Sequence, residues 1–152
     1  MKGTNILLEK EKQKYKDSFL KETDISTFSK QELSWVKNNL EFLYSKYREE
    51  RVFHINPYVK FVTIKEEKTG QENEYIILPS KMYLDELYIY ERPIEKADKI
   101  IHLMINYNNQ FTFKELFEAL FKNIEDSKRN QLESKLMEII RKFISYQYLI
   151  IL

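Results

Sequence analysis

The chain has 152 residues, of which 43% are hydrophobic and 14% aromatic, so it is apolar enough to bury a core, which excludes an intrinsically disordered protein. Its 25 Lys and Arg residues balance 24 Asp and Glu residues, and the net charge of +1 excludes a global field that attracts nucleic acid or an anionic membrane. The chain has no Cys, which excludes disulfides, a thiolate nucleophile and Cys-based metal sites and fits a reducing cytoplasm.

The first 27 residues are rich in charge. A short apolar patch at residues 6–8 is surrounded by Lys and Glu, unlike the uninterrupted apolar stretch of a signal peptide. No segment of the chain reaches the roughly 18 consecutive apolar residues of a membrane span. We therefore expect a soluble, cytoplasmic protein whose first 27 residues form a frayed or weakly helical tail.

A capping box predicts the start of the first well-formed helix. In Ser-Lys-Gln-Glu at 29–32 the Ser side chain can accept from the amide three residues on while Glu32 reaches back, with Phe28 and Leu33 as the hydrophobic staple. Apolar residues then recur at intervals of three and four, which predicts an amphipathic helix over 30–50.

Three strands are predicted after Asn-Pro at 56–57, where the proline interrupts helical geometry. Residues 58–65 alternate in polarity and are rich in β formers, Gly70 marks a turn, and 75–78 read as the returning strand of a hairpin. Residues 82–90 predict a third strand.

Three helices are predicted next. Pro93 fits the first position of a helix over 94–105, where its missing amide hydrogen has no partner to lose. A second capping box at 112–115 predicts a short helix, and a longer one spans 128–146. The apolar end at 148–152 favours a short additional strand.

The predicted order is an amphipathic helix, three strands and three helices. Because strands and helices are segregated along the chain, the predicted class is α+β, winged helix-turn-helix-like, with a three-stranded antiparallel sheet followed by three helices. Two parts are expected, a charged tail with the amphipathic helix at 1–56 and a winged-helix-like domain at 57–152.

Motifs for catalysis, metal binding and nucleotide binding are missing. His54 and His102 have no ligand-spaced partner, and Gly3 and Gly70 are too few to form a phosphate-binding loop. No Ser has a nucleophile-elbow context, and paired carboxylates lie in predicted bends or a linker. We therefore expect a non-catalytic protein that uses no cofactor and no metal.

Three helices beside a hairpin are also typical of winged-helix regulators of transcription. In the usual DNA-binding arrangement the wing follows the recognition helix, whereas the strands predicted over 58–90 precede all three helices. The last predicted helix, 128–146, mixes Lys and Arg with Glu133 and Glu138, and phosphate contacts need clustered positive charge. Nucleic acid is therefore the less favoured partner.

The same order resembles the precursor peptide recognition element of ribosomal natural-product pathways, bacteriocin maturation among them, whose prototype is the peptide chaperone of pyrroloquinoline quinone biosynthesis. The resemblance covers about residues 57–152. Its three strands correspond to 57–61, 75–79 and 82–90, and Phe-Thr-Phe-Lys-Glu-Leu at 111–116 opens the second of its three helices.

In that family a leader peptide adds as a strand to the edge of the third strand and packs apolar side chains against the third helix. Unpaired edge amides give general affinity, and pockets for alternate side chains give selectivity. The resemblance implies the following peptide-binding residues here: at the edge Tyr83, Leu84, Leu87, Tyr88, Ile89 and Tyr90, and on the groove wall Lys135, Leu136, Ile139, Lys142, Phe143 and Tyr146. Leu136, Ile139 and Phe143 fit an ordinary core equally well, whereas we expect Tyr88, Tyr90, Lys135 and Lys142 to be exposed.

The resemblance implies a stand-alone recognition protein that binds a leader peptide and presents it to a separate peptide-modifying enzyme. The helix predicted over 30–50 offers a surface for that enzyme or for a second copy of the chain in a homodimer. Two alternatives stay open: a winged-helix transcriptional regulator, and an adaptor subunit of an enzyme complex.

Overall fold

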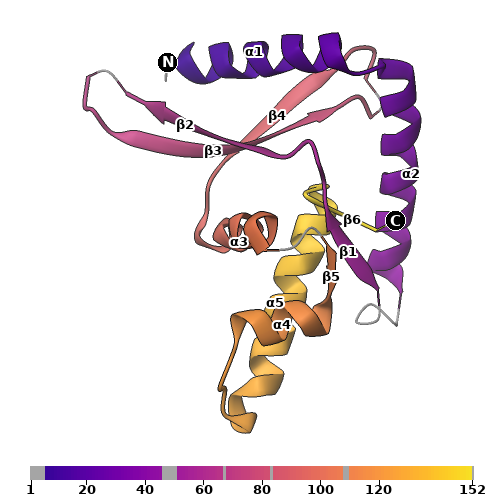
Figure 1. The fold of residues 1–152 in the computed structure, drawn as a ribbon, viewed down its shortest axis with the longest axis vertical. Helices are drawn as coiled ribbons and strands as arrows, with labels where there is room; N and C mark the ends of the chain where they lie inside the picture. The colour runs from indigo at the N-terminus through magenta and orange to yellow at the C-terminus, as the bar shows by residue number, and fades with distance from the viewer. Residues whose placement is uncertain (1–5, 46–50, 67, 83, 108–109, 152) are drawn as a thin grey trace. The chain divides into compact units, whose positions relative to one another are not determined.

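The structure is a computed structural model that describes residues 6–45, 51–66, 68–82, 84–107 and 110–151 (Figure 1). Its helices are α1 (Ile6–Glu22), α2 (Ile25–Tyr44), α3 (Lys99–Tyr107), α4 (Phe113–Leu120) and α5 (Asp126–Ser145), with a short 3-10 turn η2 (Lys96–Asp98). Its strands are β1 (Val52–Ile55), β2 (Lys60–Lys65), β3 (Glu72–Ser80), β4 (Tyr88–Pro93), β5 (Gln110–Thr112) and β6 (Leu149–Ile150). The predicted α+β class is confirmed.

The chain divides into two units, each made of two segments. Unit 1 comprises Met1–Leu33 and Pro57–Asp98, and unit 2 comprises Ser34–Asn56 and Lys99–Leu152. This division differs from the expected one, which had a single boundary after residue 56, because each unit has its own sheet: β2-β3-β4 in unit 1 and β5-β1-β6 in unit 2. The prediction of one sheet followed by three helices is therefore wrong in its order. Along the chain, β1 precedes the sheet of unit 1, and β5 and β6 lie among and after the last three helices.

In unit 1, α1 packs on one face of the antiparallel sheet β2-β3-β4 (Figure 1). Alternate strand residues point to this face, as the period of two requires. A buried Leu, Ile or Phe contributes about 1.5–3 kcal/mol, so this cluster fixes α1 on the sheet. Its buried members are Leu8, Phe19, Phe28, Val62, Ile64, Ile77, Leu87 and Ile89.

Of the two expectations for the first 27 residues, a frayed or a weakly helical tail, the frayed one is wrong, because residues 6–22 form α1 and pack on the sheet. Leu8, Lys12, Tyr15 and Phe19 recur at intervals of four, three and four, which is the stripe of a helix packed on one side. Lys12 occupies a core position of this stripe and is only 6% exposed. A lysine can do so because its aliphatic stem packs while its ammonium reaches a polar partner.

The helix α2 begins about one turn before its predicted start, because Asp24 caps it. The Asp24 carboxylate accepts from the Ser26 amide at 3.2 Å and from the Thr27 hydroxyl at 2.8 Å. Glu32, the expected acid of a capping box, is 2% exposed and accepts from the Lys81 amide at 2.9 Å. Its carboxylate holds the loop after β3, which is what the sequence pattern did not reveal.

The predicted hairpin forms over β2 and β3, with Gly70 in the turn at a φ of 69°, a left-handed conformation that glycine adopts without strain. The third strand, predicted over 82–90, is β4 and begins only at residue 88. Pro93 ends this strand and does not open a helix. Beyond it, the Asp98 carboxylate accepts from the Glu95 amide at 2.7 Å and closes the η2 turn.

In unit 2, β1 pairs antiparallel with β5 on one side and β6 on the other. The strand at 52–55 is not predicted from the sequence, whereas β6 confirms the short strand expected near the C-terminal end. The side chain of Asn39 on α2 ties this region together. Its amide donates to the carbonyl oxygens of Ile144 at 3.3 Å and Leu149 at 3.0 Å, and its own oxygen accepts from the Ile151 amide at 3.0 Å.

The second predicted capping box is confirmed at the start of α4. The Thr112 hydroxyl accepts from the Glu115 amide and the Glu115 carboxylate accepts from the Thr112 amide, both at 3.2 Å. The long final helix is α5, whose buried face packs within unit 2 and consists of Leu136, Ile140, Phe143 and Ile144.

Candidate functional site

The expected site residues fall in both units. Those of the expected edge lie in or just before β4 of unit 1: Leu84, Leu87, Tyr88, Ile89 and Tyr90. Those of the expected groove wall lie on or just after α5 of unit 2: Lys135, Leu136, Ile139, Lys142, Phe143 and Tyr146. Tyr83 lies outside the described residues. The two halves belong to different units, so each is considered by itself.

The α5 half offers little apolar surface. Leu136 and Phe143 are 2% and 1% exposed and belong to the core of unit 2, and Ile139 is half-buried. Lys135 and Lys142 are exposed, as predicted, and so is Tyr146 just after the helix. This half therefore presents lysines and a tyrosine instead of an apolar wall.

The β4 half alternates between buried and exposed side chains. Leu87 and Ile89 are each 3% exposed and belong to the core beneath α1. Tyr88 and Tyr90 are 46% and 47% exposed, as predicted, and their rings meet edge to face with centroids 4.6 Å apart. Leu84, before the strand, is also exposed. The strand thus displays an aromatic pair beside a sheet edge.

The pairing register shows which amides of β4 face away from the sheet. The Ile94 amide donates to the carbonyl of Glu74, the position opposite it on β3, at 2.9 Å. Opposite residues in an antiparallel pair alternate between bonded and non-bonded, so Tyr88 and Tyr90 bond to β3 whereas Ile89 and Glu91 do not. The N–H and C=O groups of Ile89 and Glu91 therefore point outward.

Two prolines fit this register. Pro79 of β3 stands opposite Ile89, and Pro93 of β4 stands opposite Tyr75, so both occupy non-bonded positions of the β3–β4 pair. Proline has no amide hydrogen, and such positions are where a ladder loses nothing by it. Pro93 also ends the outward row of donors. Because β4 is the last strand in the order β2-β3-β4, this outer edge has no strand partner among the described residues.

An ammonium lies between α1 and this edge. The Lys12 Nζ is 3.4 Å from an oxygen of Glu91 and 3.5 Å from one of Glu9, and it lies 5.1 Å from the centre of the Tyr88 ring. Burial lowers the pKa of Lys12, but the charges of Glu91, Tyr88 and Glu9 together outweigh it, so the pKa lies above the ordinary value of lysine. Lys12 therefore stays charged and fixes Glu91. The sequence did not reveal this role of Lys12, because a lysine at this position interrupts the apolar stripe of α1.

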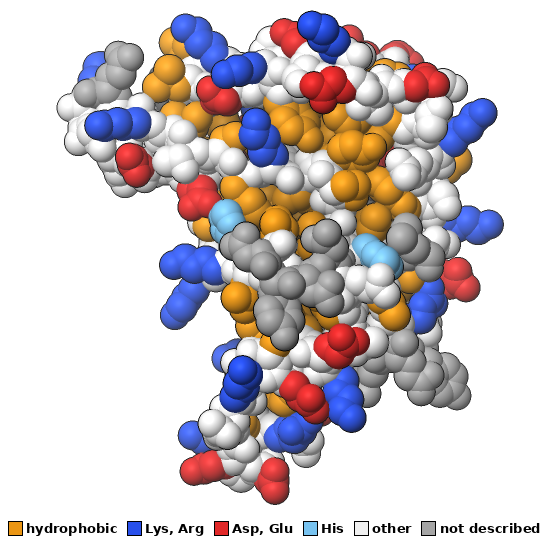
Figure 2. All heavy atoms as spheres, viewed as in Figure 1, with side chains coloured by type: hydrophobic (Ala, Val, Ile, Leu, Met, Phe, Trp, Pro, Cys, Tyr) orange, Lys and Arg blue, Asp and Glu red, His pale blue; other side chains and the backbone are white. Residues whose placement is uncertain are grey.

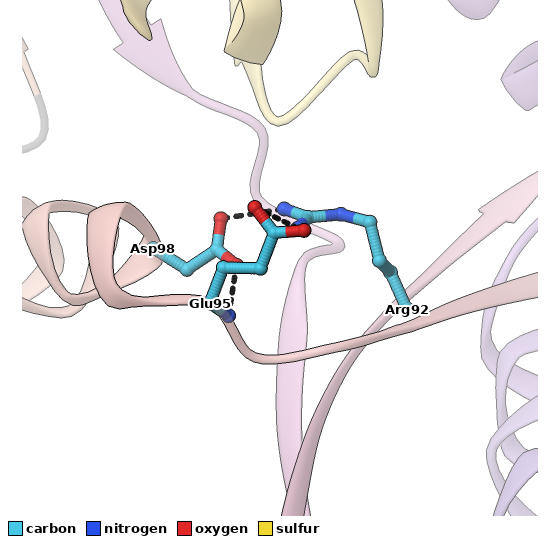
Figure 3. Close-up of polar contacts among 3 residues, drawn as sticks. All are labelled: Arg92, Glu95 and Asp98. Atoms are coloured by element: carbon cyan, nitrogen blue, oxygen red, sulfur yellow. Dashed lines mark hydrogen bonds and ion pairs between the residues drawn. The ribbon is translucent and has the colours of Figure 1, made fainter.

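A second ionic cluster closes the far end of β4 (Figure 3). Arg92 donates to the carboxylate of Asp98, which is 1% exposed, and lies 3.6 Å from an oxygen of Glu95. The guanidinium is thus held by acids of the same unit, as the dashed lines in Figure 3 show. Its role is to fix the strand end and the η2 turn.

Charges of both signs are interspersed over the face of the molecule that Figure 2 shows. Within the described ranges, no three His, Asp or Glu side chains gather closely enough to hold a metal ion. No helix among the described residues is both long and apolar enough to cross a membrane.

No protein-family model, no curated protein and no solved structure matches the chain.

Proposed function

We propose that the chain is a non-catalytic recognition protein that binds an extended peptide as an added strand at the outer edge of β4. In the form that the sequence resemblance implies, the peptide is the leader segment of a ribosomally made precursor, which is presented to a separate modifying enzyme. The observation that supports this best is the register of β4, which turns the amides of Ile89 and Glu91 outward. The proposal rests on unit 1 alone.

An antiparallel strand laid beside β4 exchanges hydrogen bonds with Ile89 and Glu91. Each residue offers one N–H and one C=O, and each bond contributes about 0.5–1.5 kcal/mol net, so the four bonds of these two residues give modest, sequence-independent affinity. The exposed rings of Tyr88 and Tyr90 supply area for a side chain of the incoming strand. Selectivity in strand addition comes from such side-chain contacts.

A proline scan of the two sheet edges tests the proposal. Peptides of about 12 random residues are selected on the full chain by display, and the affinity of a selected peptide is measured by calorimetry. Glu91→Pro removes an outward donor without removing a bond to β3, and we expect it to weaken binding by about tenfold or more. Glu91→Gln removes the charge of the side chain but keeps the backbone N–H, so it measures the effect of the charge alone.

The opposite edge provides the matched control. The Glu66 amide donates to the Gln71 carbonyl, so by the same alternation the Thr63 amide on β2 also faces away from β3. Thr63→Pro therefore removes one outward donor from the other edge of the same sheet and should leave affinity unchanged. Equal losses in the two proline variants, or no loss in either, would overturn strand addition at β4.

For the enzyme partner we propose the exposed apolar side chains of α2 in unit 2. Leu40 is 50% exposed and Tyr44 is 85% exposed, and residues four apart lie on the same side of a helix, so the two form an exposed apolar pair. Leu40→Ser should leave peptide affinity unchanged. A homodimer through this helix is distinguished by sedimentation, since Leu40→Ser then lowers the measured mass.

A second candidate, a winged-helix regulator that binds DNA, is favoured by the order of elements in unit 2. There the helices α3, α4 and α5 precede β6, which joins a three-stranded sheet, so a strand does follow the last helix. The charge of α5 is less favourable, because Arg129 is paired with Glu133 at 3.0 Å. Binding to labelled duplex DNA that falls steeply between about 50 and 200 mM salt, with no peptide binding, would support this candidate and overturn the first.

A further inference from the structure

The proposed peptide edge is surrounded by carboxylates. The segment from residue 84 to 95 contains one cation, Arg92, and its guanidinium is already held by Asp98. Four carboxylates of this segment are exposed, two in the bend before β4, one in the strand and one just after it: Asp85, Glu86, Glu91 and Glu95. The edge therefore has a local excess of negative charge, although the whole chain has a net charge of +1.

Beside Glu91, the ammonium of Lys12 is shared between two carboxylates. Lys12 contacts a single oxygen of Glu91 and a single oxygen of Glu9, and the side chains of these acids are 32% and 48% exposed. The second oxygen of each carboxylate has no partner among the described residues. A further cation placed here gains attraction from both acids, because Lys12 is shared between them.

The exposed tyrosines of β4 add aromatic rings to this group of charges. The rings of Tyr88 and Tyr90 are each about half exposed at 46% and 47%. Aromatic faces attract guanidinium and ammonium groups, and Lys12 already lies over the Tyr88 ring. The carboxylates and the aromatic rings of the edge therefore both favour cationic side chains.

We infer that the peptide added at β4 is basic and places a Lys or Arg directly opposite Glu91. This inference rests on the proposed function. Residues opposite each other in neighbouring strands share a face, so the residue facing Glu91 lies beside Glu91, Glu9 and Lys12. Because the net charge of the chain is +1, its global field does not attract a cationic peptide, and the preference is a property of this edge.

Three capped ten-residue peptides of alternating sequence test the inference: Thr-Arg, Thr-Gln and Thr-Glu repeats. Each is titrated into the isotope-labelled full chain, and both affinity and hydrogen exchange of the Ile89 and Glu91 amides are measured by NMR. We expect the Thr-Arg peptide to bind tightest, about three- to tenfold more tightly than Thr-Gln at low salt, and Thr-Glu to bind weakest. Added salt should reduce the difference between the peptides.

Two charge-matched variants locate the effect. Glu9→Gln keeps the Lys12–Glu91 pair and should reduce the preference for the Thr-Arg peptide by about twofold or more. Glu11→Gln makes the same change on the same helix, on the flank near Tyr58 and Lys60 of the β2 side, and should leave the preference unchanged. If the two variants reduced the preference for the Thr-Arg peptide equally, the preference would not arise from the carboxylates beside Glu91, and the inference would be overturned.

The outcomes separate this inference from the function on which it rests. Slowed exchange of Ile89 and Glu91 with all three peptides at equal affinity supports strand addition and overturns the basic preference. Binding of the Thr-Arg peptide without slowed exchange at these amides overturns both. Slowed exchange with the Thr-Arg peptide, lost with Thr-Glu, supports both.

Discussion

The two units build their sheets in different ways. In unit 1 the three strands follow one another along the chain, and β3 forms six residue pairs with each neighbour. In unit 2 the strands β5, β1 and β6 contain three, four and two residues and come from distant parts of the chain. A sheet with so few backbone bonds needs other support, which in unit 2 comes from side-chain amides.

Each unit also buries polar side chains on its helices, and two of them, Lys12 and Asn39, act differently. Lys12 in unit 1 contributes its apolar stem and directs its charge to Glu91 at the surface. Asn39 in unit 2, 3% exposed, bonds to three backbone groups of the C-terminal segment. An apolar residue can replace the stem of a lysine, but it cannot satisfy backbone groups.

The largest expected effect follows from Asn39. Asn39→Ala leaves the carbonyls of Ile144 and Leu149 and the amide of Ile151 without this partner, and we expect a loss of about 3 kcal/mol in the free energy of unfolding. The better helix propensity of Ala offsets only about 0.5 kcal/mol of this. Urea denaturation followed by circular dichroism measures the change. The neighbouring Asn38→Ala, which removes one bond to the Ile151 carbonyl, should cost about 1 kcal/mol; equal losses would contradict the special role of Asn39.

An intermediate effect is expected at Lys12. Lys12→Ala removes the packed stem and the ion pair and should lower the free energy of unfolding by about 1.5 kcal/mol. Lys12→Met keeps the stem and should stay within about 1 kcal/mol of the unsubstituted chain. Asn39→Leu is denatured in the same experiment as a comparison. The apolar replacement of Lys12 in unit 1 should be tolerated, whereas the apolar replacement of Asn39 in unit 2 should not. Equal losses for Lys12→Met and Lys12→Ala would show that the charge, and not the stem, fixes α1.

Local signals predicted the parts of the fold that depend on neighbouring residues. The turn at Gly70 and the capping box at Thr112 and Glu115 are confirmed, because each depends on side chains a few residues apart. The helix α1 was missed since its stripe includes Lys12, which a polarity pattern counts against a core position. The strand β1 was missed because four residues are too few for alternation to be read, and its partners lie far away in the sequence.

The candidate site shows the same limit. Exposure of Tyr88 and Tyr90 followed from alternation along the strand and is confirmed. Which amides of β4 face outward depends on the pairing with β3. A shift of this pairing by one residue exchanges the amides that bond to β3 with those that face away from it. Pro93 carried this information, since proline is tolerated in a strand only where no ladder donor is needed, but its fit to the first turn of a helix favoured the other interpretation.

The smallest effect is expected at Tyr15, which joins α1 to the chain before β2. Its hydroxyl donates to the Tyr58 carbonyl at 2.6 Å, and Tyr15→Phe should cost only about 0.5 kcal/mol at pH 7. Burial, and to a smaller degree Tyr58, raises the pKa of Tyr15 from 10.0 to about 12.

The raised pKa of Tyr15 predicts a pH dependence of unit 1. Between about pH 10 and 12 the unfolded chain releases a proton that the folded chain retains, so stability is full below this window and falls as the pH rises through it. Tyr15→Phe removes this contribution, and its urea midpoint should fall less steeply across the window. Lys12, whose pKa is also raised, acts with the same sign, so the comparison is made in the Lys12→Met background. Identical slopes with and without the Tyr15 hydroxyl in that background would show that burial of Tyr15 against the sheet does not govern the alkaline stability of unit 1.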